Sequence, residues 1–386
     1  MKRGLAGAAR VVVSGMVAGD PYQGGASWAV LQYVLGLQRL GCDVVLVEQW
    51  QPPADVKSLT RTPSGFYFRE VVRAFGLEER SALLRAGTEE TVGLVYSRLR
   101  ERCGGADLLI NVSGILTDPE LLSRIPVRAY LDLDPAFNQL WHESGIDMRF
   151  DPHNRFVTVG QALGTPDCPV PTGGRDWIPT LPPVVLDHWP SAGGPGDGSF
   201  TSIGNWRGYG SVEHGGVHYG QRVHSMRQFM ELPRRTDAQF RLALAIHPDE
   251  RKDLEALDEN GWKLVDPVDA AGTPERYARF IRRSTAELGI AKSGYVLSRS
   301  GWFSDRSACY LASGRPVLAQ ETGFSRFLPA GEGLLSFETL DDAVAGVEAI
   351  RGSYERHARA ARELAEELLD SDRVLQALLD AIFEGS

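Results

Sequence analysis

The sequence alternates short apolar runs with longer stretches whose apolar residues recur every three or four positions. In the first third, apolar runs rich in β-branched residues predict strands at residues 10–14, 43–47, 107–112 and 127–132. Helical spacing predicts helices at residues 26–39, 66–75 and 89–102. Strands that alternate with helices in this way are typical of a doubly wound domain on a parallel sheet.

The alternation pauses over residues 151–198, where proline and glycine are frequent, and then resumes. Further strands are predicted at residues 155–159, 199–203, 240–246 and 316–320. Further helices are predicted at residues 223–230, 247–259, 273–284 and from Ser304 onward, followed by a helical tail over 340–383. Two alternating regions joined by a proline-rich segment predict an α/β protein with two Rossmann-like doubly wound domains facing a cleft.

The composition is that of a globular protein, with 43% hydrophobic and 24% charged residues. The net charge of −9 argues against nucleic acid and anionic membranes as partners. No apolar run is long enough to span a membrane, and Arg10 interrupts the short apolar segment that follows Lys2 and Arg3 at the N-terminus. The four cysteines are too widely spaced for a disulfide framework or a zinc site. We therefore expect a cytoplasmic protein with free thiols.

Residues 291–335 carry the most specific pattern, which is a loop, a helix, a glycine turn, a buried strand and a second glycine loop. This order resembles the nucleotide-sugar half of GT-B glycosyltransferases, in the style of the retaining-type "glycosyl transferases group 1" branch. The matching residues are 312–317 (Ala-Ser-Gly-Arg-Pro-Val), 322–323 (Thr-Gly) and 333–335 (Gly-Leu-Leu). That branch usually carries two glutamates eight positions apart, and here Gly301 and Cys309 stand where they would fall.

The resemblance implies a division of work between the two domains. Residues 1–185 would bind the acceptor, residues 186–370 would bind a nucleoside diphosphate sugar, and a helix in 371–386 would cross back to the first domain. The implied function is transfer of a hexosyl or deoxysugar unit to a hydroxyl or amine acceptor. Two alternatives stay open, a GT-B-shaped nucleotide-sugar epimerase and a degenerate domain that binds a sugar nucleotide or a partner without catalysis. A homodimer also stays open.

The predicted donor site combines cations with backbone N–H groups. Arg207 follows the strand at 199–203 and is the first candidate for the diphosphate, with Arg222 as its partner, because guanidinium groups bind phosphate oxygens bidentately. Two loops before helix starts offer N–H groups that bind phosphate. The donor-binding candidates in these loops are Ser300, Ser304, Arg306, Thr322, Gly323, Phe324 and Ser325. The alternative is that both arginines are surface residues and Ser304 is a helix N-cap.

The predicted acceptor side lies on the first domain. Gly24, Gly25 and Ser27 stand between the first strand and the first helix, where GT-B enzymes place a glycine loop near the transferred sugar. This loop is neither a GxGxxG fingerprint nor a Walker A loop, which removes the usual signals for a dinucleotide or a nucleoside triphosphate.

Asp132 and Asp134 are the candidate catalytic residues. Strand alternation sends both side chains to the same side, where one would act as a general base or hold a sugar hydroxyl. The alternative is that they cap the turn that follows, and Asp20 and His153 are the next candidates for the base. Asp132-Leu-Asp134 also matches the DxD pattern that binds Mn²⁺ in the other major glycosyltransferase fold. Since GT-B enzymes do not depend on it, we expect no metal and no cofactor besides the sugar nucleotide.

Overall fold

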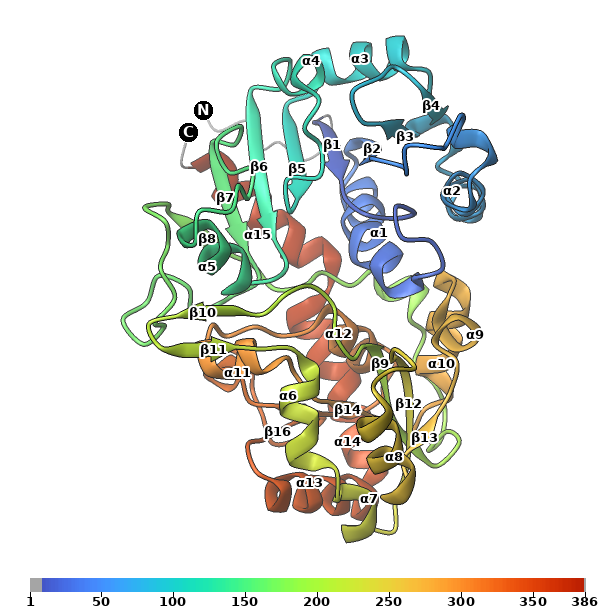
Figure 1. The fold of residues 1–386 in the computed structure, drawn as a ribbon, viewed down its shortest axis with the longest axis vertical. Coiled ribbons are helices and arrows are strands. Elements are labelled where there is room, and N and C mark those ends of the chain that lie inside the picture. Colours follow the sequence, from blue (N-terminus) through green and yellow to red (C-terminus); the bar gives the residue numbers. More distant parts are fainter. Residues whose placement is uncertain (1–8, 385–386) are drawn as a thin grey trace.

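Two mostly parallel sheets, one in each half of the chain, organise the molecule (Figure 1). The computed structural model describes residues 9–384. The basic start that contains Lys2 and Arg3 lies outside the described residues. No helix within residues 9–384 has the length and apolar character needed to cross a bilayer. All four cysteines are free and buried.

The first sheet has eight strands in the order β4-β3-β2-β1-β5-β6-β7-β8. Their bounds are β1 Arg10–Ser14, β2 Asp43–Trp50, β3 Ser81–Arg85, β4 Thr91–Gly93, β5 Leu108–Val112, β6 Val127–Asp132, β7 Arg155–Thr158 and β8 Trp177–Pro179. All neighbouring strands run parallel except β4, which is antiparallel to β3. Val11, Val12 and Val13 of the central strand β1 are fully buried, because side chains pack against both of its faces.

Helices pack on both faces of this sheet. They are α1 Gly24–Arg39, α2 Pro63–Ala74, α3 Tyr96–Gly104, α4 Pro119–Leu122 and α5 Phe137–Glu143. The helix predicted over residues 89–102 is wrong in its first part, because residues 81–93 form the antiparallel pair β3–β4. Leu83 and Val92 are buried and pair across these two strands, so tertiary pairing outweighs the apparent helical spacing.

The second sheet has six parallel strands in the order β13-β12-β9-β14-β15-β16. Their bounds are β9 Ser199–Asn205, β12 Gln239–Ala245, β13 Lys263–Leu264, β14 Ala286–Gly289, β15 Val317–Gln320 and β16 Leu334–Phe337. The helices are α6 Arg222–Met226, α7 Leu232–Arg235, α8 Arg251–Glu259, α9 Pro267–Ala271, α10 Pro274–Arg283, α11 Ser293–Ser298, α12 Asp305–Ala312, α13 Leu340–Gly352 and α14 Tyr354–Leu364. Strand β14 escaped prediction because it is only four residues long and contains the fully buried carboxyl group of Glu287.

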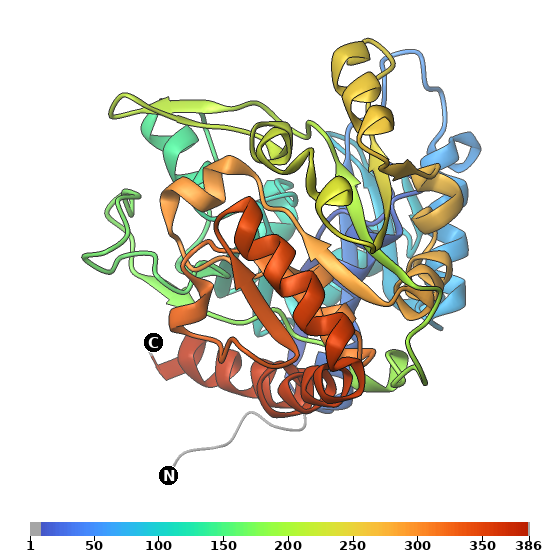
Figure 2. The same cartoon turned by 90° about the horizontal axis from the view of Figure 1, so that it is seen from below.

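Two segments tie the domains together. The hairpin β10 Val212–His214 and β11 Val217–Tyr219 follows β9 in sequence, yet its Val212 and Tyr219 share an apolar cluster with Phe137 of α5. Residues 208–221, which are rich in glycine, tyrosine and histidine, therefore form a bridge between the domains. Seen from below, the C-terminal helices and this hairpin lie at opposite edges of the molecule (Figure 2).

The second tie is the C-terminal helix α15 Ser371–Glu384, which packs on α1 of the first domain (Figure 1). A Cβ added at Gly36 of α1 would lie 2.5 Å from a methyl carbon of Leu375, so this packing needs glycine there. Where the chain crosses between the domains, the Val184 N–H donates to the Leu369 carbonyl at 2.8 Å, and the Ser371 N–H donates to the Val184 carbonyl at 2.9 Å.

Candidate active site

A cleft of about 500 Å³ lies between the two domains. The first domain contributes the β1–α1 loop, residues 20–25, and Leu133 and Asp134, which follow β6. The second domain contributes the carboxyl ends of β9 and β12, the N-terminal turn of α12, and helix α9. In open α/β sheets this edge is where ligands bind, because the strands there end in loops and helix N-termini.

Arg222 lies in the floor of this cleft and is 7% exposed. One terminal nitrogen donates to the Ile290 carbonyl at 2.7 Å and to the Ser202 hydroxyl at 3.4 Å. Its Nε has no hydrogen-bond partner among the described residues, and no carboxylate of residues 9–384 pairs with it. Burial, together with the nearby charge of Arg306, lowers the pKa of Arg222 to about 9. The guanidinium is therefore a buried cation whose charge the surrounding protein leaves unbalanced.

Arg306 is the second buried cation of the cleft. Its Nε donates to Glu287 Oε1 at 2.5 Å, and a terminal nitrogen donates to the Ile203 carbonyl at 3.0 Å. Burial works against the charge, but the Glu287 carboxylate outweighs it and raises the pKa of Arg306 above its ordinary value. Glu287 thus forms its ion pair with Arg306, and Arg222 is left as a buried cation of the cleft without an ion pair among the described residues.

The start of α12 also faces the cleft. Ser304 is the N-cap of this helix and accepts from the Arg306 N–H at 3.2 Å. Both Ser304 and Arg306 line the cleft, as predicted, and the residue between them, Asp305, was not predicted. No side chain within residues 9–384 donates to the Asp305 carboxylate, and burial raises its pKa. The signal in the sequence was its position, midway between the missing glutamates.

Asp134 lies where the two domains meet. Its Oδ1 accepts from Lys292 Nζ at 3.1 Å and from the hydroxyls of Tyr209 and Tyr295, all three on the second domain. Burial alone would raise the pKa of Asp134, but the Lys292 ammonium and the two hydroxyls outweigh it and hold that pKa below its ordinary value. Lys292, Tyr209 and Tyr295 line the cleft as well, and sequence reasoning missed all three.

The expectation that Asp132 faces the cleft together with Asp134 is wrong. Asp132 is fully buried at the end of β6. Its carboxylate accepts from four donors inside the first domain, which are Asp134 N, Asn138 Nδ2, Gln139 Nε2 and Thr158 Oγ1 at 2.6 to 2.9 Å. The strand ends at Asp132, so alternation does not extend to Asp134, and Asp132 instead caps the turn.

Of the remaining first-domain candidates, some line the cleft and others are buried away from it. Gly24, Gly25 and Asp20 line the cleft, and a Cβ added at Gly24 would lie 2.3 Å from the Thr273 carbonyl oxygen of the second domain. Ser27 does not line it, because it is fully buried and its hydroxyl contacts the Tyr67 hydroxyl at 3.1 Å. His153 is also buried away from the cleft, and burial lowers its pKa to about 4.

Arg207 lies outside the cleft lining, where its guanidinium pairs with Glu250. The second predicted donor loop, residues 322–325, also lies outside the cleft. Gly323 and Ser325 line a separate hollow of about 530 Å³ on the surface. Three other residues of the predicted donor loops lie inside the protein, namely Ser300, Thr322 and Phe324, each at most 1% exposed. The Gly301 N–H donates to the Thr322 carbonyl at 2.9 Å, so this loop braces the one before α12 and does not reach the cleft.

No group of three histidine, cysteine, aspartate or glutamate side chains within residues 9–384 is arranged to hold a metal ion. The DxD pattern in particular does not form a pair of ligands, since Asp132 is already occupied by the four donors of its own domain.

This architecture is similar to that of known proteins. Residues 227–380 match a protein-family model described as "Glycosyl transferase-like". No curated protein sequence matches the chain. Among solved structures, an alpha-glucosyltransferase in complex with UDP-glucose and DNA superimposes with a TM-score of 0.60 and 13% identity, covering 98% of this chain and 100% of that one.

Two further structures are similar over nearly the whole chain. Sucrose-phosphate synthase from Thermosynechococcus elongatus matches with a TM-score of 0.56 and 12% identity, covering 98% of this chain and 100% of that one. The Anabaena protein HepE in complex with UDP and glucose matches with a TM-score of 0.58 and 10% identity, covering 97% and 100%.

These structures correct one prediction. Nucleic acid was excluded as a partner because of the net charge of −9, and that exclusion is wrong, since alpha-glucosyltransferases in complex with DNA share this fold. Net charge is a sum over the whole surface, and a negative sum leaves local positive surfaces intact.

The architecture confirms the predicted fold class, two Rossmann-like units facing a cleft. The chain therefore has the GT-B fold, and its residues 227–380 match a glycosyl transferase-like family model, which supports an enzyme of the glycosyltransferase class.

Proposed function

We propose that this enzyme transfers a sugar from a nucleoside diphosphate sugar to a hydroxyl or amine acceptor, with the donor on the second domain and the acceptor on the first. The observation that carries this proposal is Arg222, a guanidinium that is 7% exposed, lines the cleft and has no carboxylate partner within residues 9–384. An unpaired buried charge is costly. A bound diphosphate would supply the missing negative charge.

In this arrangement the diphosphate lies between Arg222 and the start of α12. Arg306 adds a second cation, and the dipole of α12 favours an anion at this end of the helix. When the bond between the sugar and the diphosphate breaks, negative charge grows on the leaving phosphate. Fixed cations and N–H groups in a cleft with little water stabilise that charge strongly.

Asp134 is the proposed catalytic residue of the first domain. Its carboxylate lines the cleft and stays ionised beside Lys292, so it is ready to accept a hydrogen bond or a proton from the acceptor hydroxyl. As the acceptor oxygen forms its bond to the sugar carbon, its proton would pass to Asp134. Asp20 lines the same cleft and is the second candidate for this role.

The same proposal includes a metal-independent reaction in the cytoplasm without a cofactor. Four free, buried cysteines fit a reducing compartment. The cations of the cleft perform the charge stabilisation that a metal ion supplies in other enzymes.

The test is a panel of nucleoside diphosphates and their sugars, with melting temperature as the first measurement. A ligand at ~100 times its Kd should stabilise the protein by about 2.7 kcal/mol. The best donor is then incubated with candidate acceptors in EDTA, and product should form. The donor proposal is wrong if no nucleoside diphosphate raises the melting temperature. The metal-independent part is wrong if turnover is lost in EDTA and restored by Mn²⁺.

A further inference from the structure

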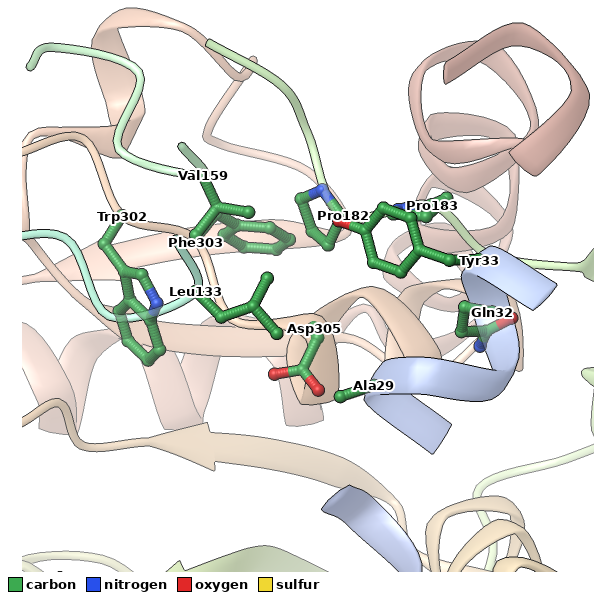
Figure 3. Close-up of a pocket in the computed structure, with 10 residues that line it drawn as sticks. All are labelled: Ala29, Gln32, Tyr33, Leu133, Val159, Pro182, Pro183, Trp302, Phe303 and Asp305. Carbon is green, nitrogen blue, oxygen red and sulfur yellow. The ribbon is translucent and has the colours of Figure 1, made fainter. Parts of the chain in front are cut away.

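A small chamber lies beside the cleft at the first turn of α12, and Figure 3 shows the residues that line it. The two spaces are adjacent, because four residues line both of them: Ala29, Leu133, Trp302 and Asp305. The chamber itself measures about 20 Å³. A water molecule needs roughly 10–15 Å³, so there is room for one hydroxyl-sized group.

The walls of the chamber are mostly apolar but contain one unused polar group. Val159, Pro182, Pro183 and Phe303 surround the space (Figure 3). Tyr33 of α1 is 2% exposed, and its hydroxyl has no hydrogen-bond partner among the described residues. Burial and the nearby Asp305 carboxylate raise the pKa of this hydroxyl well above its ordinary value, so it keeps its proton. A buried hydroxyl without a partner is costly and normally has a ligand or water to bind.

Gln32, a further polar residue of the chamber, already has hydrogen-bond partners inside the protein. The Gln32 Oε1 accepts from the Val185 N–H at 2.8 Å, and its Nε2 donates to the sulfur of Cys309 at 3.7 Å. The polar groups left for a ligand are therefore the Tyr33 hydroxyl inside the chamber and, at its edge, the Trp302 indole N–H and the Asp305 carboxylate. That carboxylate accepts from backbone N–H groups at the start of α12 but from no side-chain donor within residues 9–384.

We infer that the chamber receives the hydroxymethyl arm of the transferred sugar, so that the donor is a hexose that keeps its 6-hydroxyl. The arm's hydroxyl pairs with Tyr33, and its methylene lies among Ala29 and Leu133 at the mouth. Asp305 accepts from a neighbouring ring hydroxyl. This inference rests on the proposed donor site, because Asp305 stands between Ser304 and Arg306 and the sugar is joined directly to the diphosphate they bind.

Hydroxyl recognition of this kind gives strong selectivity. A site with a buried polar group left unpaired rejects the analogue that lacks the hydroxyl far more than a purely apolar pocket rejects an extra one. A 6-deoxyhexose would leave Tyr33 unpaired in the closed chamber. The enzyme therefore selects hexose donors over their 6-deoxy counterparts.

Calorimetry tests this without knowledge of the acceptor. Three ligands with the same nucleotide are compared, which are the free nucleoside diphosphate, its hexose ester and its 6-deoxyhexose ester. The wild type should bind the hexose ester about 10-fold to 100-fold more tightly than the 6-deoxy ester. Tyr33→Phe should reduce that ratio to within about threefold while leaving the affinity for the free diphosphate unchanged.

Two further variants sharpen the result. Tyr130→Phe removes another buried tyrosine hydroxyl, in β6 away from the chamber, and should keep the wild-type ratio. Ala29→Val narrows the mouth, so it should weaken the hexose ester selectively, even if Tyr33→Phe proves unstable. Equal wild-type affinity for both esters, or a ratio that survives both Tyr33→Phe and Ala29→Val, overturns the inference. Failure of the free diphosphate to bind the wild type would instead refute the donor site itself.

Discussion

The two domains that form the cleft treat their buried charges in opposite ways. On the first domain, the Asp132 carboxylate accepts from four donors of its own domain, and Glu48 accepts from the backbone N–H groups of Ala18 and Gly19 at 2.7 and 2.6 Å. On the second domain, Glu287 pairs with Arg306, and Arg222 has no carboxylate partner among the described residues. The buried carboxylates of the first domain are satisfied within that domain, whereas the Arg222 cation of the second domain has no ion pair.

This difference separates residues that hold the fold from residues that await a ligand. A satisfied buried group stabilises its own loop, whereas an unbalanced buried cation lowers stability and is retained for what it binds. Asp134 is the exception on the first domain, because all three side chains that donate to its carboxylate come from the other domain. Asp134 therefore belongs with the residues that await a ligand.

The largest expected effect comes from replacing Asp134, with the replacement of Asp132 as the contrast. Asp134→Asn should lower turnover by about 10²- to 10⁴-fold, since a general base typically contributes that much, while nucleoside diphosphate affinity stays within a few-fold. Asp132→Asn should instead lower the melting temperature, because an amide nitrogen would face donors in place of an acceptor. Steady-state kinetics on both variants measure the loss of turnover, and thermal melts measure the loss of stability. Near wild-type turnover in Asp134→Asn would move the base to Asp20.

A smaller effect should follow from replacing the unbalanced cation. Arg222→Leu should weaken nucleoside diphosphate binding by at least about 30-fold, because truncating one member of a buried charge pair costs about 2–5 kcal/mol. The melting temperature of the free protein should stay level or rise, since a buried charge without a partner is removed. Calorimetry and thermal melts measure both quantities.

Arg207→Gln is the informative contrast to that variant. Its side chain is exposed and paired with Glu250 outside the cleft, so diphosphate affinity should change by less than about threefold. If instead Arg207→Gln loses diphosphate binding and Arg222→Leu keeps it, Arg207 and not Arg222 binds the diphosphate.

The last prediction concerns the pH dependence of stability that the buried Glu48 of the first domain produces. Burial outweighs the two backbone N–H donors and raises the pKa of Glu48 to about 7, against an ordinary value of 4.5. Between these values the folded protein holds a proton that the unfolded chain releases, so the unfolding free energy falls as pH rises from 4.5 to 7. This group's contribution is up to about 3 kcal/mol. Melts at several pH values should show a shallower fall in Glu48→Gln, and an unchanged slope would contradict the neutral state of this carboxyl.

Much of the fold was predictable because its signals are local. The apolar runs at residues 10–14 and 127–132 became the strands β1 Arg10–Ser14 and β6 Val127–Asp132, since strands buried in a parallel sheet need uninterrupted apolar sequence. The helix start at Ser304 was equally predictable from sequence, because its N-cap hydrogen bond joins residues only two positions apart. These features depend on neighbours in the chain, so the sequence alone determined them.

The site depended on contacts that no local pattern records. Asp132 and Asp134 look equivalent in sequence, and only the end of β6 at Asp132 sends one into its own domain and the other towards Lys292, 158 residues away. Arg207 and Arg222 likewise differ only in where β9 and the β10–β11 hairpin place them, one beside Glu250 and the other against the Ile290 carbonyl. The sequence determined which chemical groups were available and which domain carried them. The tertiary structure alone decided which charges found partners, because burial and pairing arise when distant segments pack together.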